Sequence, residues 1–556
     1  MEPLTLSWRD YAGAAVLAVA VIVGAALRMQ PGVIGVIDDD AVYAVTAKSL
    51  AEGHGYRLIN LPGAPPQTKY PILYPAIISL AWRAGALSSS PGVEQSLFAM
   101  QVTTAAIAGV ALALAYLFIV RFGIAARTAA FAACVLVTSA PNYLFYCSQT
   151  VSEMPFLALM IAALWVVELR LRATGPAPSL ARDVAAGMLV GLPFLCRTAG
   201  IVVPVAAVGL LAYRRKPVRG IALGVMVVTL PWLAWMFYGA HTASDEIIGY
   251  QTDYLGWWRT NASLIVPLSN IRMAFAAFLH IDFEYLARAA YNNIAHAKWL
   301  MAALGSLPWI VVLSRARSLA LVPVMLLVYF ALLVAWPWPP DRFLVPMLPL
   351  LGAMLFDAVW KLAARASVAR VAKPLVAAAF AAVLVSNEWM LSTYVSASRT
   401  AGYPYFIWPG IPVEWQSYQK AFAWLRENSQ PGDVVAAGFD TMTSLYTGRA
   451  AIRPFNSRPL ALFYGVGGSP VGDVAELEGF LASYGAKYLL LAPLPAYDLE
   501  EPFYNLVYAA SDERPGLLRP VWQLRTDPRF TIYQVSAADH RGGGTPAEKG
   551  LQNPGP

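Results

Sequence analysis

Long apolar runs separated by short polar segments recur along most of this chain. A membrane-spanning helix needs about 20 predominantly apolar residues, and the pattern predicts about eleven such helices. The predicted spans are residues 11–29, 96–119, 126–142, 152–170, 184–197, 199–213, 220–238, 299–313, 318–336, 343–361 and 374–394. The short runs 184–197 and 199–213 fit either two helices or one re-entrant pair. The first-order expectation is therefore a polytopic α-helical membrane protein.

Composition supports this class and excludes others. Of the 556 residues, 58% are hydrophobic and only 13% are charged, whereas soluble globular chains carry about 25% charged residues. The net charge of +7 is explained by short basic loops beside a membrane. No stripe of Lys and Arg interleaved with aromatic residues predicts a nucleic-acid groove. We therefore expect the lipid bilayer, and no nucleic acid, as a partner.

Basic residues occur at alternate turns between the predicted spans. The positive-inside rule places such turns in the cytoplasm, which puts the N-terminus there as well. An apolar N-terminal run also fits a signal peptide, but the many later spans favour an uncleaved first helix. The basic turns contain Arg121, Arg127, Arg170, Arg172, Arg182, Arg214, Arg215, Lys216, Arg219, Arg315, Arg317, Lys361, Arg365, Arg370 and Lys373.

Three long segments then face outward. Residues 30–95 and 239–298 are predicted loops of a membrane domain that covers residues 1–394. Residues 395–537 alternate helix-like and β-rich runs, which predicts a small soluble α/β domain. Residues 538–556 are Gly-, Pro- and polar-rich, which is typical of a disordered tail.

The first outward segment carries the most chemistry. Asp38, Asp39 and Asp40 follow the first span directly, and one of them can cap the helix expected after them. Capping explains one carboxylate but not three adjacent ones at a membrane surface, where like charges repel each other. A general base with a neighbouring carboxylate that binds a cation or orients a hydroxyl explains them better, although a solvated acidic turn is the simpler alternative.

A lysine loop follows in the same segment. Lys69 lies between aromatic and proline residues, with Tyr70 after it and Tyr74 a few positions on. Prolines stiffen the chain, and a cation held at the water–lipid boundary suits a lipid phosphate.

Three charged residues mark the outer ends of other spans. Glu153 opens the span 152–170, where it is either a first-turn carboxylate favoured by the helix dipole or a functional carboxylate at membrane depth. Arg342 follows Trp336–Pro340 at an outward turn, and Arg197 lies between two short spans. Both guanidinium groups are candidates to bind a phosphate leaving group.

These features, in this order, resemble membrane glycosyltransferases of the GT-C superfamily, in particular glycosyltransferase family 39 with the protein O-mannosyltransferases and the aminoarabinose transferases of lipid A. The resemblance rests on Asp39–Tyr43, the segment Ala47–Tyr56, the Lys69–Pro71 loop, Ser152–Pro155 and Arg342–Phe343. It implies the GT-C fold, a bacterial inner membrane, an active site at the periplasmic face and a polyprenyl-phosphate sugar donor. It departs from the family in Asp39-Asp40, where Asp-Glu is commoner, and in lacking the full lysine-loop pattern of the lipid A enzymes.

The expected function is inverting transfer of a sugar to an acceptor hydroxyl of a protein, lipid or glycan. Asp39 is the expected general base, with Asp40 and Glu153 as further catalytic residues. Substrate contacts are expected from Tyr43, His54, Lys69, Tyr70, Tyr74, Arg197 and Arg342. A divalent cation, Mg²⁺ or Mn²⁺, held by Asp40 and Glu153 is left open. The alternatives are a lipid-sugar flippase or a non-catalytic assembly subunit with the same fold.

Overall fold

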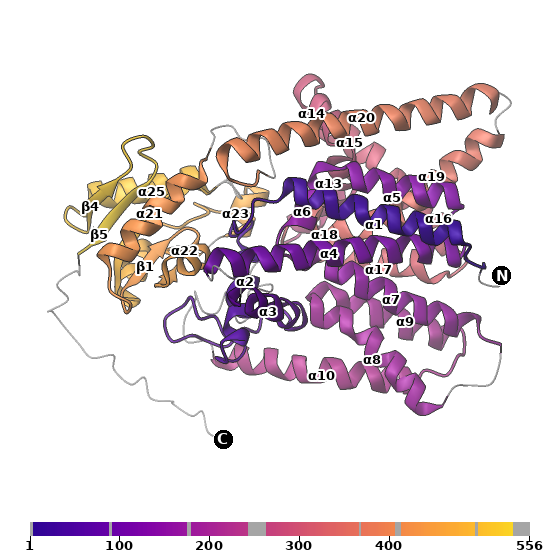
Figure 1. Ribbon diagram of the computed structural model, residues 1–556, viewed down its shortest axis with the longest axis horizontal. Helices are drawn as coiled ribbons and strands as arrows, with labels where there is room; N and C mark the ends of the chain where they lie inside the picture. The colour runs from indigo at the N-terminus through magenta and orange to yellow at the C-terminus, as the bar shows by residue number, and fades with distance from the viewer. Residues whose placement is uncertain are drawn as a thin grey trace.

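The protein has two parts, a long helical bundle and a smaller domain that contains the strands (Figure 1). The two parts meet at one end of the bundle, and the N-terminus lies at the other end. The tail expected to be disordered lies outside the described residues. The computed structural model describes residues 4–87, 92–174, 179–242, 259, 263–365, 369–405, 413–456, 458–494 and 499–536.

The bundle is built from the apolar runs of the sequence. Among the described residues, seven helices are long and apolar enough to cross a membrane, or eight if the pair α5 and α6, bent by 71°, is one span. Every predicted run coincides with a helix or a helix pair, which confirms a multi-pass membrane protein. The helices of the bundle are α1 (Trp8–Arg28), α4 (Val93–Arg121), α5 (Arg127–Ser139), α6 (Pro141–Ser148), α7 (Glu153–Arg172), α8 (Leu180–Cys196), η1 (Thr198–Ile201), α9 (Val202–Tyr213), α10 (Arg219–Thr242), α13 (Ile265–Asp282), α14 (Glu284–Asn293), α15 (Ala297–Gly305), α16 (Leu307–Ala316), α17 (Leu321–Ala335), α18 (Asp341–Leu344), η2 (Val345–Met347), α19 (Leu348–Arg365) and α20 (Ala369–Ala401).

Glycine lets two of these helices approach closely. A Cβ atom on Gly187 of α8 would lie 2.1 Å from the carbonyl oxygen of Ile221, and one on Gly224 of α10 would lie 2.1 Å from that of Val184. Lipid gives no hydrophobic driving force between helices, so small residues at close contacts are a common solution in membranes.

Part of the predicted outward loop 239–298 is helical. Helix α13 packs against α15 and α17 inside the bundle, and α14 turns back beside it. The side chain of Asn387 in α20 donates to the carbonyl oxygen of Asp282 over 2.9 Å, which joins the end of α13 to a spanning helix. Helices α13 and α14 are therefore part of the bundle.

Basic residues gather at the end of the bundle that holds the N-terminus. The Arg127 guanidinium lies 2.9 Å from Asp10 near the start of α1, and Arg315 lies 2.7 Å from Asp357. The backbone N–H of Leu4 donates to the carbonyl oxygen of Arg121 over 2.8 Å. The bundle thus has one basic end.

The opposite end of the bundle carries the first outward segment. Its helices α2 (Asp39–Ala51) and α3 (Leu73–Ala86) pack against each other, and α3 packs on α4. Figure 1 shows both between the bundle and the strands. The acidic residues at the start of α2 therefore lie where the two parts meet.

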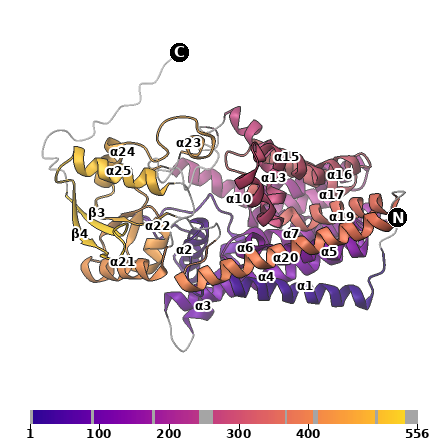
Figure 2. The same ribbon diagram turned by 90° about the horizontal axis from the view of Figure 1, so that it is seen from above.

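The smaller part is an α/β domain with one five-stranded sheet, as the sequence predicted. The strand order is β2-β1-β3-β5-β4, with β2, β1 and β3 parallel and β5 antiparallel to both of its neighbours. Figure 2 shows α21 on one side of the sheet and α24 and α25 on the other. The elements are α21 (Trp415–Asn428), β1 (Val434–Ala437), α22 (Asp440–Thr447), β2 (Ala450–Ile452), α23 (Pro459–Tyr464), α24 (Val474–Ser483), β3 (Ala486–Leu491), α25 (Glu500–Glu513), β4 (Leu518–Gln523) and β5 (Thr531–Val535).

Candidate active site

The acidic loop, residues 35–40 leading into the start of α2, is shaped by its third carboxylate, Asp40. The two oxygens of Asp40 accept hydrogen bonds from the backbone N–H groups of Gly35, Val36 and Ile37 at 2.8, 3.2 and 3.1 Å. Burial raises the pKa of Asp40 to about 6, although these three hydrogen bonds act to lower it. Asp40 is therefore a structural residue of the loop, facing backbone rather than substrate.

Asp39 is the carboxylate that faces an open space. One oxygen accepts from the hydroxyl of Tyr70, and the other lies 2.6 Å from Arg342. A quarter of its side chain is exposed. A carboxylate held at both oxygens and still accessible is well placed to accept a proton from a hydroxyl.

Glu153 lies deeper and joins two arginines. Its side chain is fully buried; Arg197 approaches it to 2.7 Å, and Arg342 also hydrogen-bonds to it. Because Arg342 contacts Asp39 as well, a continuous chain of alternating charges runs from Asp39 through Arg342 and Glu153 to Arg197. A buried carboxylate is tolerated only with such partners.

Lys69 is a buried cation in a fixed loop. The Gln67 side-chain oxygen accepts from the backbone N–H groups of Lys69 and Tyr70 at 2.7 and 3.3 Å. The Trp235 indole holds the same loop through the carbonyl oxygen of Gln67 at 2.8 Å. Burial lowers the pKa of Lys69 to about 8, while Asp39 and Asp38 act to raise it.

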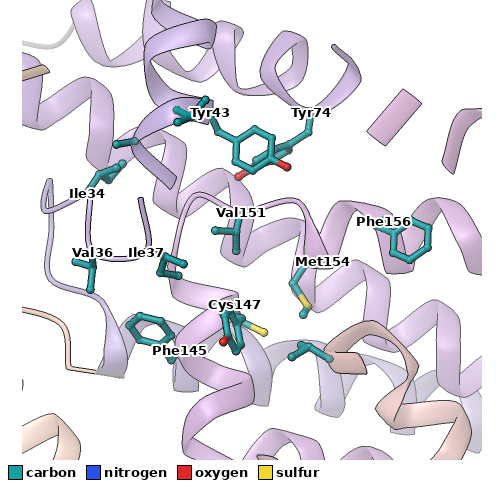
Figure 3. Packing of buried hydrophobic residues seen from close by; sticks show 14 of the residues in the cluster. Ile34, Val36, Ile37, Tyr43, Tyr74, Phe145, Cys147, Val151, Met154 and Phe156 are labelled. Atoms are coloured by element: carbon teal, nitrogen blue, oxygen red, sulfur yellow. The ribbon is translucent and has the colours of Figure 1, made fainter. Parts of the chain in front are cut away.

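Tyrosines and apolar residues form the inner side of the site. Tyr43 packs edge-on against Tyr70 and Tyr74, at 5.2 and 5.1 Å between ring centroids. Its hydroxyl donates to Ser152, at the start of α7, over 2.8 Å. Figure 3 shows these two neighbours, Tyr43 and Tyr74, in the buried layer that also contains Val151. This apolar layer lowers the local dielectric, so the charges above it interact more strongly.

These groups open onto one cavity of about 280 Å³, close to the lower limit of typical small-molecule sites. The sequence candidates among its lining residues are Asp39, Tyr43, Lys69, Tyr70, Arg197 and Arg342. Glu153 stands directly behind, bound to the two arginines. The structure therefore brings most of the expected site residues to one place.

Two expected contacts lie elsewhere. Tyr74 is fully buried behind Tyr43, and its hydroxyl shares a 2.6 Å hydrogen bond with Thr104. His54 is exposed and lies 3.8 Å from Glu52, in a turn between Gly53 and Gly55, which both have positive φ. Neither residue lines the cavity, so neither is a direct substrate contact in this geometry.

The α/β domain supplies part of the cavity wall, which the sequence did not predict. Arg453, just after β2, lines the cavity and lies 2.6 Å from Asp38 and 3.5 Å from Asp440. Burial raises the pKa of Asp440 to about 6, and Arg453 acts to lower it. Asp38 has a φ of +72°, a backbone conformation that is costly for a non-glycine residue. The ion pair to Arg453 fixes the loop in this form.

The expected divalent-cation site does not fit these contacts. Both oxygens of Asp40 are occupied by backbone N–H groups, and the carboxylate of Glu153 is bound by two guanidinium groups. In the part of the chain that the structure describes, no group of three or more His, Cys, Asp or Glu side chains could hold a metal ion. In this geometry Asp40 and Glu153 are therefore already bound by other groups of the protein.

No known protein family matches this sequence, and no curated protein does. The structure is similar to that of the archaeal oligosaccharyltransferase AglB from Archaeoglobus fulgidus in complex with an inhibitory peptide and a dolichol-phosphate. The TM-score is 0.52 at 14% identity, over 87% of this chain and 70% of that one. A structure of the Archaeoglobus fulgidus oligosaccharyltransferase with Zn and sulfate gives a TM-score of 0.53 at 15% identity, over 94% and 73%.

The protein has the GT-C fold. A further similar structure is that of ArnT from Cupriavidus metallidurans bound to undecaprenyl phosphate, with a TM-score of 0.49 at 14% identity over 96% of this chain and 99% of that one. In this GT-C fold the acidic loop, the lysine loop and the turn that carries Arg342 meet at the end of the bundle next to the α/β domain.

Proposed function

We propose that the protein is a glycosyltransferase that moves a sugar from a polyprenyl-phosphate donor to an acceptor hydroxyl of a protein, lipid or glycan. One observation carries the proposal: an accessible carboxylate, Asp39, shares a cavity with the cations Lys69, Arg197 and Arg342. Such a transfer needs a base for the hydroxyl proton and cations for the phosphate that leaves. The dolichol-phosphate in the AglB structure supports a lipid donor of this class.

In the proposed reaction, the acceptor oxygen attacks the anomeric carbon from the face opposite the phosphate. Asp39 takes the hydroxyl proton as the new C–O bond forms. The bond between the anomeric carbon and the phosphate oxygen breaks, and its electron pair stays on the polyprenyl phosphate. The configuration at the anomeric carbon is therefore inverted.

The cations act where negative charge develops. Arg342 bridges Asp39 and Glu153 before the donor binds, and a phosphate would share this guanidinium. Lys69 and Arg197 add two charges within a buried setting, where electrostatic interactions are stronger than in water. Glu153 keeps both arginines in place rather than touching substrate.

The charge distribution supports one orientation in the bilayer. The basic end of the bundle would face the cytoplasm and the cavity would open at the periplasmic face of a bacterial inner membrane. The polyprenyl chain would then lie in the outer leaflet, with its phosphate at the level of the lysine loop.

The test compares wild type with Asp39→Asn at equal folded amounts. Purified protein is given a mixed pool of radiolabelled polyprenyl-phosphate sugars and a membrane extract as the acceptor source. We expect label transfer by wild type and a loss of about 10²–10⁴-fold in the variant, the usual contribution of a positioned base. Asp512→Asn, at an exposed position of the α/β domain, is the matched control and should transfer like wild type.

The possible outcomes separate the alternatives. Full transfer by Asp39→Asn would remove Asp39 from the role of base while keeping the enzyme class. Donor binding without transfer by wild type would favour an assembly subunit. Movement of the lipid-linked sugar across a vesicle bilayer, also without transfer, would favour a flippase.

A further inference from the structure

Asp341 is a cavity carboxylate that the proposed chemistry does not use. It is the first residue of α18, and 37% of its side chain is exposed. Its sequence neighbour Arg342 turns to Asp39 and Glu153, whereas Asp341 lies 3.1 Å from His280 of α13. Two adjacent residues thus face different parts of the same cavity.

A hydrogen-bond chain fixes one oxygen of this carboxylate. The Nδ1 atom of His280 contacts Oδ1 of Asp341, and its Nε2 atom lies 2.9 Å from the hydroxyl of Tyr291 in α14. With a neutral imidazole the network assigns Nδ1–H as the donor to Asp341 and the Tyr291 hydroxyl as the donor to Nε2. Among the described residues no hydrogen-bond donor or cation is paired with Oδ2, which leaves that oxygen as an acceptor for a ligand.

Two tryptophans line the cavity beside Asp341. Trp336 packs against Phe343, and Trp338 packs edge-on against Phe463 of α23, with 6.1 and 5.4 Å between ring centroids. Aromatic rings offer broad apolar faces, and small-molecule sites combine such faces with a few placed polar groups.

The same helix α13 supports both features. The side-chain N–H₂ of Asn270 donates to the carbonyl oxygens of Leu333 and Trp336 at 3.1 and 2.5 Å. Its oxygen accepts from the hydroxyl of Tyr464 in α23 at 2.9 Å. Asn270 thereby fixes the tryptophan turn, while His280, at the other end of α13, fixes Asp341.

A carboxylate attracts donors and repels a phosphate. The cations of the cavity suit the phosphate of the donor. An acidic group beside two indole rings instead suits the sugar that this phosphate carries. Sugars present hydroxyl donors around the ring edge and C–H groups on its faces. We infer that Asp341, Trp336 and Trp338 form a sugar subsite, in which Asp341 accepts hydrogen bonds from hydroxyl groups of the transferred sugar.

The inference rests on the proposed function and makes Asp341 a specificity-determining residue and His280 a positioning residue. A hydrogen bond to a charged group is worth enough to change affinity by about 10–100-fold. Loss of this bond should weaken binding of a sugar-bearing donor and leave binding of the bare lipid phosphate unchanged.

The experiment measures quenching of tryptophan fluorescence of the purified full chain in detergent. The probes are bare undecaprenyl phosphate and undecaprenyl phosphate that carries glucose, mannose, N-acetylglucosamine or arabinose. We expect wild type to bind at least one glycosylated probe more tightly than the bare lipid. Asp341→Asn and His280→Leu should each reduce that preference by about 10–100-fold.

His280→Asn provides a rescue, because the asparagine N–H₂ group occupies nearly the position of Nδ1 and still donates to Asp341. It should retain most of the preference that His280→Leu loses, which a purely packing role for His280 does not predict. Thermal unfolding of each variant checks that the fold is retained.

Equal preference in wild type and Asp341→Asn would overturn the inference alone. So would a wild type that binds bare undecaprenyl phosphate but gains nothing from any attached sugar. A wild type that binds neither the bare nor the glycosylated lipids would overturn the proposed function, and the subsite with it.

Discussion

The buried lysine of the cavity predicts a pH dependence of donor binding. The pKa of Lys69 is lowered to about 8 because the ammonium group is removed from water, against the opposing effect of Asp39 and Asp38. Below this pH the side chain is cationic and binds phosphate, and above it the side chain becomes neutral. Raising the pH through 8 should therefore weaken binding of the lipid phosphate.

The size of the effect follows from the protonated fraction. With a pKa of about 8, about nine-tenths of Lys69 is charged at pH 7 and about one-tenth at pH 9. If only the charged form binds tightly, the apparent Kd is the intrinsic Kd divided by that fraction. The Kd should then rise about tenfold between pH 7 and pH 9, which corresponds to about 1.4 kcal/mol.

The assay is fluorescence titration with undecaprenyl phosphate at pH 7, 8 and 9. The second ionisation of a phosphate monoester lies near pH 6, so its own charge changes little over this range. Asp40 and Asp440, with pKa values of about 6, also stay largely ionised. Lys69→Arg is the matched control, because guanidinium remains charged throughout.

A flat Kd in wild type would refute the reasoning, as would an equal slope in wild type and Lys69→Arg. A bound phosphate also favours the charged form of Lys69. The fall in kcat, which reports the complex, should therefore occur at higher pH than the fall in kcat/KM, which reports the free enzyme.

Three further substitutions test the framework around the cavity. Glu153→Gln leaves the buried Arg197 guanidinium without a carboxylate partner and Arg342 with Asp39 alone, so we expect a loss of about 3–5 kcal/mol in stability; an unchanged thermal midpoint in detergent would contradict this. Tyr446→Phe removes the acceptor of the Ile34 N–H and should cost about 1–3 kcal/mol in the same assay, and wild-type stability would show that this contact contributes nothing. Asp40→Ala frees three buried N–H groups, so limited proteolysis should cut the acidic loop faster than in wild type; an equal rate would argue against Asp40 as its organiser.

The spanning helices were predictable from the sequence because continuous apolar runs are a strong signal. Helix α13 was missed for the converse reason. Asn270, Arg272 and His280 interrupt its apolar pattern, so hydropathy placed it in a loop. Asn270 and His280 hold residues of the cavity wall through hydrogen bonds. The polar residues that made the helix hard to predict are therefore the ones that connect it to the site.

Only the residue types of the candidate site and their positions relative to the spans could be predicted from the sequence. Asp39, Lys69 and Arg342 each stand at the outer end of a span or in the first outward loop, and such positions converge in a bundle. The separate roles of Asp39 and Asp40 could not be predicted, since two adjacent carboxylates differ only in which backbone groups the folded loop presents. His54 lies in an exposed turn, where no sequence pattern distinguishes it from a cavity residue.

Contacts between distant parts of the chain cannot be predicted from any local pattern, and here they determine the position of Asp39, the proposed base. Arg453 binds Asp38, the residue before Asp39, and Tyr446 hydrogen-bonds to the backbone of Gly32 and Ile34. A Cβ on Gly35 would collide with Met442 of α22 at 2.5 Å, so the loop and the α/β domain fit together without room for a side chain. The α/β domain is therefore a structural support of the acidic loop. Because the loop is held from this side and the Asp39 carboxylate is held by Arg342 from the bundle side, displacement of the α/β domain would change the position of Asp39 itself.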